Sequence, residues 1–268
     1  MLFRSTVAAE VVACRLNGSR ITLVILEIII IGIILRWTPV LMYPGVVGVD
    51  PWGHQQLVAA LLKLGYMPDF ALKYATMPIY HLLVGATSLI TNLEYKYATM
   101  VSVNLLQVVI DVLLIFLLGK AMFNYRVGLL AGLLLTVAGF HVQKGFWTIP
   151  NTMGVTIVLV MLYLLLNLRI KFHLRGAILI LVMAATLIMT HPVASLFMAL
   201  SLFALLAGFI VYAYLYHKEE ATSLSVVLVF LFTLGMLSYW LYVTGLFAKL
   251  VTIVWSTFIA SIDRKSVV

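Results

Sequence analysis

The chain has 268 residues, of which 64% are hydrophobic and 10% are charged, and its mean hydropathy is +1.16. A soluble domain carries roughly 25% charged residues, so this composition excludes a soluble globular protein and indicates an integral membrane protein. The single cysteine, Cys14, excludes a disulfide framework and a multi-cysteine metal site. The net charge of +8 comes from basic residues in short loops beside apolar segments, a pattern typical of membrane topology rather than nucleic-acid binding.

The first twenty residues read MLFRSTVAAEVVACRLNGSR. Glu10 and Arg15 interrupt the apolar core that a signal peptide needs. We therefore expect residues 1–20 to be a basic leader that stays in the cytoplasm. No linker or internal repeat follows, so residues 1–268 are expected to form a single transmembrane domain.

Apolar stretches near 20 residues recur from Ile21 to Ile262. Each can cross a hydrocarbon core of roughly 30 Å as a helix. The pattern predicts an all-α, polytopic transmembrane bundle of about eight spans. The predicted spans are 21–42, 97–118, 127–142, 152–168, 176–190, 193–215, 223–246 and 248–262.

A ninth apolar piece, MPIYHLLVGATSLI at 77–90, is shorter, and whether it crosses decides the topology. Short cytoplasmic loops collect Lys and Arg. If 77–90 crossed, the basic cluster at 169–175 and the pair Lys120 and Arg126 would lie outside. If it does not cross, all of them lie inside. The sequence therefore predicts cytoplasmic termini in a cell membrane and a first extracytoplasmic loop, 43–96, with juxtamembrane helices, one of them half-inserted.

Under this topology, polar side chains gather on the extracytoplasmic side of the membrane. They are Asp50, His54, Lys63 and Lys73 from the first outer loop, His141, Lys144, Trp147 and Asn151 from the loop after the third span, and His191 from the next outer turn. Each also has a purely structural interpretation. Lys144 and Trp147 fit an interfacial anchor as well as a substrate contact, and a single histidine at a membrane boundary can simply be solvated.

Asp50 opens the stretch DPWGH, directly before Pro51. An aspartate at the N-cap followed by proline in the first turn is a common pattern at the start of a helix. The sequence predicts a helix over 51–64 that stops at Gly65. Asp50 is thus either a helix cap or a reactive carboxylate, and the sequence leaves both open.

Three ionisable residues, Glu27, Arg36 and Asp111, fall inside predicted spans, where charges are costly unless they are paired or face a cavity. Asp111 stands near Asn104 and Gln107. We expect a polar seam between packed helices here, because neither helix carries a run of ionisable positions that would line a transport pathway.

Five stretches together resemble the GT-C superfamily, whose members include oligosaccharyltransferase catalytic subunits and protein O-mannosyltransferases. They are GVDPWGHQQLVAALLKLGYMPDF, MPIYHLLVGATSLI, LLQVVIDVLLIFLLGKAMFNYRVGLLAGLLL, KGFWTIPNTMGVTIVLVMLYLLL and MTHPVASLF. The likeness extends from about residue 20 to 215, and DPWGH is its most specific part. It implies a membrane glycosyltransferase that takes a sugar or glycan from a polyprenyl-phosphate carrier and transfers it to an acceptor on the extracytoplasmic face.

By this resemblance Asp50 would be the catalytic or metal-organising carboxylate. Lys63, Lys73 or Lys144 would supply positive charge to the leaving phosphate, and Trp147 and Asn151 would contact substrate. The resemblance implies a divalent metal, Mn²⁺ or Mg²⁺, held by Asp50, His54, His141 and His191.

The chain departs from the family at Asn151, where many members carry a second acidic residue. An amide is a weak ligand for a metal, so this departure favours an alternative, a non-catalytic membrane subunit of the same fold. Members also commonly carry more spans and a soluble domain, which implies a partner subunit or a further C-terminal region. A small-solute transporter is a third reading, but it needs an inverted repeat that the sequence does not show.

Overall fold

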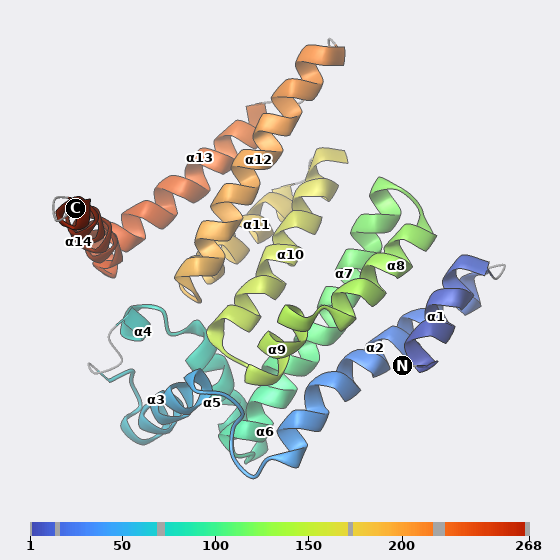
Figure 1. The fold of residues 1–268 in the computed structure, drawn as a ribbon, viewed down its shortest axis with the longest axis horizontal. Coiled ribbons are helices and arrows are strands. Elements are labelled where there is room, and N and C mark those ends of the chain that lie inside the picture. The colour runs from blue at the N-terminus through green and yellow to red at the C-terminus, as the bar shows by residue number, and fades with distance from the viewer. Residues whose placement is uncertain (1, 14–16, 69–72, 171–173, 217–222, 266–268) are drawn as a thin grey trace.

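The computed structural model describes residues 2–13, 17–68, 73–170, 174–216 and 223–265, and every regular element in these ranges is a helix (Figure 1). In chain order the elements are α1 (Leu2–Ala13), α2 (Gly18–Met42), α3 (Asp50–Leu64), α4 (Lys73–Thr76), α5 (Ile79–Thr91), α6 (Tyr95–Thr99), α7 (Leu106–Met122), α8 (Tyr125–Val137), α9 (Gly139–Trp147), α10 (Pro150–Ile170), α11 (Leu174–Ile188), α12 (Pro192–Tyr216), α13 (Ser223–Ser238) and α14 (Leu246–Lys265). Two π-helical turns, Met100–Leu105 and Tyr239–Val243, continue the helices on which they lie. The predicted all-α class is confirmed.

Five helices in the described residues are long and apolar enough to cross a membrane. They are Gly18–Met42, Tyr95–Met122, Pro150–Leu168, Pro192–Tyr216 and Val226–Val243. A sixth crossing is formed if α8 and α9, which meet at a bend of 58°, count as one broken span. The chain is therefore a multi-pass helical membrane protein.

The predicted count of eight spans is not confirmed. The segments expected as the fifth and the last span are not among these candidates, because their described apolar helices, Leu174–Ile188 and Leu246–Ile259, are shorter. Helix α5, at 13 residues, is also in this shorter class. Its length fits the prediction that the 77–90 segment inserts without crossing.

The helices form two packed groups (Figure 1). Helices α1, α2, α7 and α8 share one core, built around residues such as Ile28, Phe116 and Leu129. Helices α10 to α13 share a second core, around residues such as Met161 and Met198. Helix α10 contacts both α7 and α11, so it joins the two groups.

Glycine allows α7 and α8 to approach until their backbones touch. A Cβ on Gly128 would lie 2.4 Å from the Phe116 carbonyl oxygen, and one on Gly119 would lie 2.7 Å from the Gly128 Cα. Small residues at helix interfaces are the usual means of close packing in membranes, where lipid offers no hydrophobic drive between helices. The predicted leader also joins this group, because Arg126 Nη1 donates to the Val11 and Val12 carbonyls at the end of α1, at 2.7 and 2.6 Å.

The segment between α2 and α6 folds as short helices at one end of the bundle (Figure 1). Helix α3 packs on α5 through Val58, Tyr80 and Val84. Its predicted stop is confirmed, because Gly65 takes the left-handed conformation (φ 79°) and its N–H donates to Leu61 O at 2.8 Å.

Candidate functional site

A cleft of about 680 Å³ opens at the end of the bundle that carries α3, α4 and α5. We call it the loop-side cleft. Its lining residues are Val49, Asp50, Gly53, His54, Gln56, Leu57, Tyr74, Ile149, Pro150, His191, Thr244, Leu246 and Lys249. They come from the three polar segments predicted on one side of the membrane, which are the first outer loop, the loop before α10 and the turn before α12, and from the region around Gly245, between the last two predicted spans. The structure thus brings these four segments together, whichever side of the membrane they face.

Asp50 lies at the rim of the cleft and does not cap α3. The N-cap residue is Val49, and no side chain makes a capping hydrogen bond there, so the helix-cap alternative is wrong. Pro51 follows within the first turn, and Asp50 is exposed. Burial raises the pKa of the Tyr74 phenol to about 12, and the nearby negative charge of Asp50 adds to this increase.

His54, one turn further along α3, lines the same cleft but is 94% buried, with an exposed fraction of 6%. Its Nδ1 lies 3.0 Å from Nε2 of His81 on α5. The rings of Tyr74 and Tyr80 meet His54 edge-on, with centroids 4.9 and 5.6 Å away. Histidine 54 is therefore held on its inner side by a tight aromatic cage.

His191 and Lys249 also line the cleft. His191 precedes α12, and its Nδ1 accepts a hydrogen bond from the Ala194 backbone N–H at 3.4 Å. Lys249 is exposed in the first turn of α14. The sequence interpretation missed this lysine, although a basic residue at the predicted outer end of a span departs from the positive-inside rule and was a usable signal.

Four helices begin at the cleft. Lining residues stand at or next to the first residue of α3, α10, α12 and α14, namely Asp50, Pro150, His191 and Leu246. The positive end of the helix dipole at a helix start favours an anion. With Lys249, these four helix starts make the electrostatic environment of the cleft favourable to a negatively charged group beside Asp50.

The other predicted lysines lie away from this position. Lys63 is exposed near the far end of α3 and does not line the cleft, and the side chain of Lys73 lies outside the described residues. Lys144 Nζ lies over the rings of Phe140 and Trp147, 5.3 and 4.8 Å from their centroids. This arrangement matches the interfacial-anchor alternative for Lys144.

Trp147 and Asn151 flank the cleft rather than line it. A Cβ on Gly48, whose φ is 98°, would lie 2.9 Å from the Trp147 indole, so the loop before α3 packs directly on this ring. Asn151 follows Pro150, which does line the cleft. Both residues therefore border the wall of the cleft that is formed by the α9–α10 corner.

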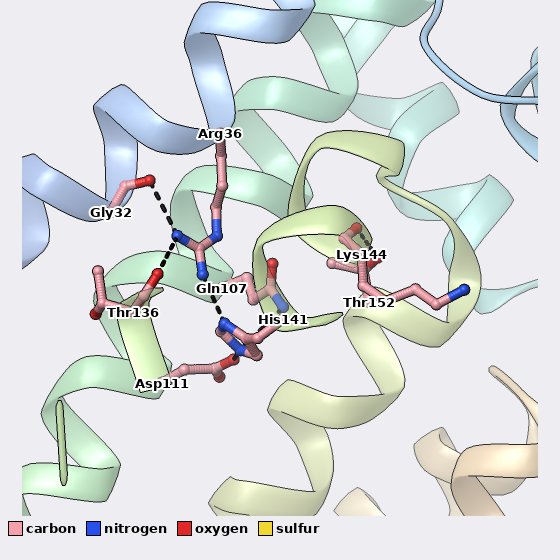
Figure 2. A network of polar contacts seen from close by, with 8 residues as sticks. All are labelled: Gly32, Arg36, Gln107, Asp111, Thr136, His141, Lys144 and Thr152. Atoms are coloured by element: carbon pink, nitrogen blue, oxygen red, sulfur yellow. Dashed lines mark hydrogen bonds and ion pairs between the residues drawn. The ribbon is translucent and has the colours of Figure 1, made fainter. Parts of the chain in front are cut away.

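His141 lies elsewhere, inside the bundle (Figure 2). Its Nδ1 is 2.6 Å from Arg36 Nη2, and its Nε2 is 2.9 Å from Asp111 Oδ2. We call these three residues, with Gln107 at 3.3 Å from Nε2, the buried network. The expectation that His141 joins Asp50, His54 and His191 in one metal site is corrected, because the chain bends after α8 and α9 places His141 in the buried network.

Proton positions in the buried network follow from its chemistry. A guanidinium can only donate, so Nδ1 of His141 is the acceptor. A neutral imidazole then carries its proton on Nε2, which donates to the Asp111 carboxylate. The side chain of His141 thus links a cation to an anion, and the three residues together balance their charge in a buried place.

The same network holds the break between α8 and α9. Arg36 Nη1 donates to the Thr136 carbonyl at 3.3 Å and to the Gly32 carbonyl at 3.1 Å (Figure 2). The Thr136 carbonyl lies in the last turn of α8, where helix carbonyls lose their partners. A Cβ on Gly145 would lie 2.5 Å from Arg36 Cδ, so α9 comes close to Arg36 only because this position is glycine.

The expected polar seam is confirmed, with one more branch. Asn104, in the π-helical turn, accepts from Trp37 Nε1 at 2.8 Å and donates to the Gly145 carbonyl at 2.5 Å. The seam therefore joins α2, α7 and α9 and serves packing, as expected for Asp111. Arg36 and His141 belong to it, and both are nine-tenths buried or more.

The predicted metal site does not assemble as proposed. Among the described residues, no three side chains of His, Cys, Asp and Glu are grouped so that they could hold a metal ion. Of the four ligands implied by the resemblance, His141 is in the buried network, and Nδ1 of His54 is turned to His81. Asp50 and His191 remain at the cleft, and no step below depends on a metal.

Comparison of the chain with protein-family models, with curated proteins and with solved structures gives no match.

Proposed function

We propose that this protein is a membrane glycosyltransferase that transfers a sugar from a polyprenyl-phosphate carrier to an acceptor at the loop-side cleft, on the extracytoplasmic face. One observation carries the proposal: an exposed, non-capping carboxylate, Asp50, lines the same cleft as Lys249 and residues at the starts of four helices. Transfer from such a carrier needs a proton acceptor for the nucleophile and positive charge for the leaving phosphate.

In the proposed reaction, the acceptor's hydroxyl or amide loses its proton to the carboxylate of Asp50. The acceptor atom attacks the anomeric carbon of the sugar, and the bond from that carbon to the phosphate oxygen breaks. The phosphate leaves with the bonding electrons and remains attached to its lipid. Lys249 and the positive ends of the α10, α12 and α14 dipoles stabilise the charge that develops on it.

The position of the cleft fits a lipid-borne substrate. It lies at the end of the bundle, beside the apolar helix α5 and the exposed aromatic side chain of Trp52 on α3. Trp is enriched where membrane meets water. A carrier can keep its tail in the bilayer there while its phosphate enters the cleft, so no large vertical movement of the lipid is needed.

A non-catalytic subunit of the same fold is the second candidate. Helix α14 favours it, because all its described side chains from Phe247 to Ile259 are exposed on the surface of the isolated chain. A partner subunit or a further C-terminal region would cover such a helix. In that case the cleft would bind no carrier and Asp50 would be dispensable.

The test uses the purified chain in proteoliposomes that contain polyprenyl-phosphate mannose or polyprenyl-phosphate glucose, with Ser-, Thr- and Asn-containing peptides as acceptors. We expect the release of polyprenyl phosphate to fall by at least about 100-fold in Asp50→Asn, because general-base catalysis contributes roughly 10²–10⁴-fold. Glu94→Gln is the matched control, since Glu94 is an exposed carboxylate of the same outer segment that does not line the cleft.

Two results would contradict the proposal. The first is an Asp50→Asn variant as active as the wild type. The second is a wild-type protein that releases no carrier phosphate from either donor and binds neither, which would favour the subunit. Addition of EDTA, followed by Mn²⁺ or Mg²⁺, tests the metal prediction in the same assay.

A further inference from the structure

Helix α14 turns away from the bundle at the end where the loop-side cleft opens. The crossing before it ends at Val243, and Gly245 follows in the left-handed conformation (φ 62°), which lets the chain change direction sharply. In Figure 1, α12 and α13 run across the view, whereas α14 is seen nearly along its own axis. Helix α14 therefore lies crosswise to the spanning helices instead of running back along α13.

Polar and apolar residues occupy different faces of α14. Lys249, Thr252 and Ser256 are spaced by three and four residues, so they share one face, and Lys249 lines the cleft. The other face is apolar and aromatic, and its exposed members are Phe247, Val251, Val254, Trp255 and Phe258. A helix with two such faces is suited to a boundary between an apolar and a polar medium.

The hydroxyl groups on the described side chains of α14 are satisfied within the helix. Thr252 Oγ1 donates to the Ala248 carbonyl at 2.9 Å. Ser256 Oγ and Thr257 Oγ1 donate to the Ile253 carbonyl at 3.0 and 2.8 Å. Unsatisfied polar groups are costly against lipid. This part of α14 can therefore lie against lipid without an unpaired hydroxyl donor.

The position of Trp255 distinguishes a helix in the plane of the membrane from one that crosses it. At about 1.5 Å per residue, a crossing α14 would place Trp255 roughly 14 Å below Leu246, near the middle of a hydrocarbon core of about 30 Å. Tryptophan and tyrosine are instead enriched at the interface between membrane and water. Tyr242, which is exposed at the end of the preceding crossing, lies at this interface just before α14 begins. An α14 parallel to the membrane keeps both aromatic residues at the interface.

We propose that α14 is an amphipathic helix that lies in the bilayer interface at the cleft end of the bundle. Its apolar face is covered by phospholipid rather than by a partner protein, and its polar face points to water and the cleft. The predicted last span, 248–262, is then a surface helix, and the end of α14 at Lys265 stays on the same side of the membrane as the cleft. This inference holds whether or not the protein is a transferase.

The first experiment labels single cysteines with a membrane-impermeant maleimide in intact cells that express the full chain. Cys14→Ala removes the one native cysteine, and this variant gives the background. Glu94→Cys reports the cleft end, and Arg175→Cys reports the opposite end, because Arg175 follows the far end of α10; both positions are exposed (Figure 1). We expect Lys265→Cys to be labelled from the same side as Glu94→Cys, with labelling from the other side lower by about 10-fold. Labelling of Lys265→Cys from the side of Arg175→Cys would mean that α14 crosses, and it would overturn the inference.

The second experiment places nitroxide spin labels along α14 in proteoliposomes made from the full chain. Labels at Val251, Val254 and Phe258 should collide most with oxygen, which dissolves in lipid, and should lie about 5–10 Å below the headgroups. Labels at Thr252 and Ser256 should instead collide most with a water-soluble nickel complex.

Each competing arrangement of α14 gives a different pattern of collisions. A crossing helix gives frequent oxygen collisions on both faces. A helix covered by a second copy of the chain gives few collisions with either reagent on its apolar face. A helix surrounded by water gives frequent nickel collisions on both faces. Any of these three patterns contradicts the interfacial position, and none of them depends on transfer activity.

Discussion

The buried network and the loop-side cleft use the same kinds of residues in opposite ways. In the buried network, His141 contacts Arg36 at 2.6 Å and Asp111 at 2.9 Å, away from water. At the cleft, Asp50 and Lys249 are both exposed, and no ion pair between them is formed in the described structure. A charge that is matched by protein holds helices together, whereas a charge left facing a cleft is ready for a ligand.

The comparison also shows why residue type alone misleads in a membrane protein. Histidine 141 is held on both ring nitrogens, and its position is determined by the break at Ala138. Histidines 54 and 191 are held at Nδ1 and line the cleft. Replacing a residue of the buried network should therefore lower the stability of the protein. Replacing a residue of the cleft should instead weaken substrate binding or transfer.

The largest effect is expected for Arg36→Met. It leaves Asp111 buried without its cation and the Thr136 carbonyl without a donor, and breaking a buried pair costs about 3–5 kcal/mol. We expect a large drop in the melting temperature of the detergent-solubilised protein, which can be measured by tryptophan fluorescence.

The double variant Arg36→Met with Asp111→Asn removes both charges and should recover part of the loss, because no bare carboxylate remains. Arg175→Met, at an exposed position on α11, is the control and should change the melting temperature little. If Arg36→Met is as stable as this control, the network does not hold the bundle.

Gly145→Ala should have a smaller effect on the same network. The new Cβ would lie 2.5 Å from Cδ and Nε of Arg36, whose guanidinium is fixed by three hydrogen bonds and cannot swing away freely. Overpacking of this kind costs about 1–3 kcal/mol. The readout is again the melting temperature.

Gly139→Ala on the same helix is the matched control, because nothing lies within 4 Å of its added Cβ. Its stability should stay within about 0.5 kcal/mol of the wild type. Equal melting temperatures for the two alanine variants would show that α9 can shift without disturbing Arg36, contrary to the packing described above.

Much of the difference between the buried network and the loop-side cleft could be predicted from the sequence, because it follows from local rules. The apolar stretches predicted the helices, the charge pattern grouped three of the four loop segments that meet at the cleft, and Asp111 beside Asn104 and Gln107 indicated a seam. The stop of α3 at Gly65 follows from the conformational freedom of glycine.

Other features depend on three-dimensional packing. The bend of 58° after α8 is not marked by a proline, so His141 was expected in a solvated loop rather than beside Arg36. The pairing of Arg36 with a residue 105 positions away has no signal in a single sequence. Lys249 was overlooked because its segment was interpreted only as a span.

The smallest effect is expected for Lys249, which lines the cleft. Lys249→Gln should raise the KM for the lipid carrier about 10-fold, since a hydrogen bond to a charged group contributes roughly 1.5–3 kcal/mol and 1.4 kcal/mol is a factor of ten. Its melting temperature should not change, because the side chain is exposed. The KM of the variant should also depend less on salt, as one of the screened attractions is gone.

Lys144→Gln distinguishes this role from a general effect of positive charge near the membrane. Its ammonium lies over the rings of Phe140 and Trp147, an interaction that contributes about 0.5–1 kcal/mol at an exposed site, and it does not line the cleft. The KM should therefore change by less than about two-fold. If Lys144→Gln weakens carrier binding as much as Lys249→Gln does, the phosphate does not sit among the four helix starts, and the cleft would have to be abandoned as the donor site.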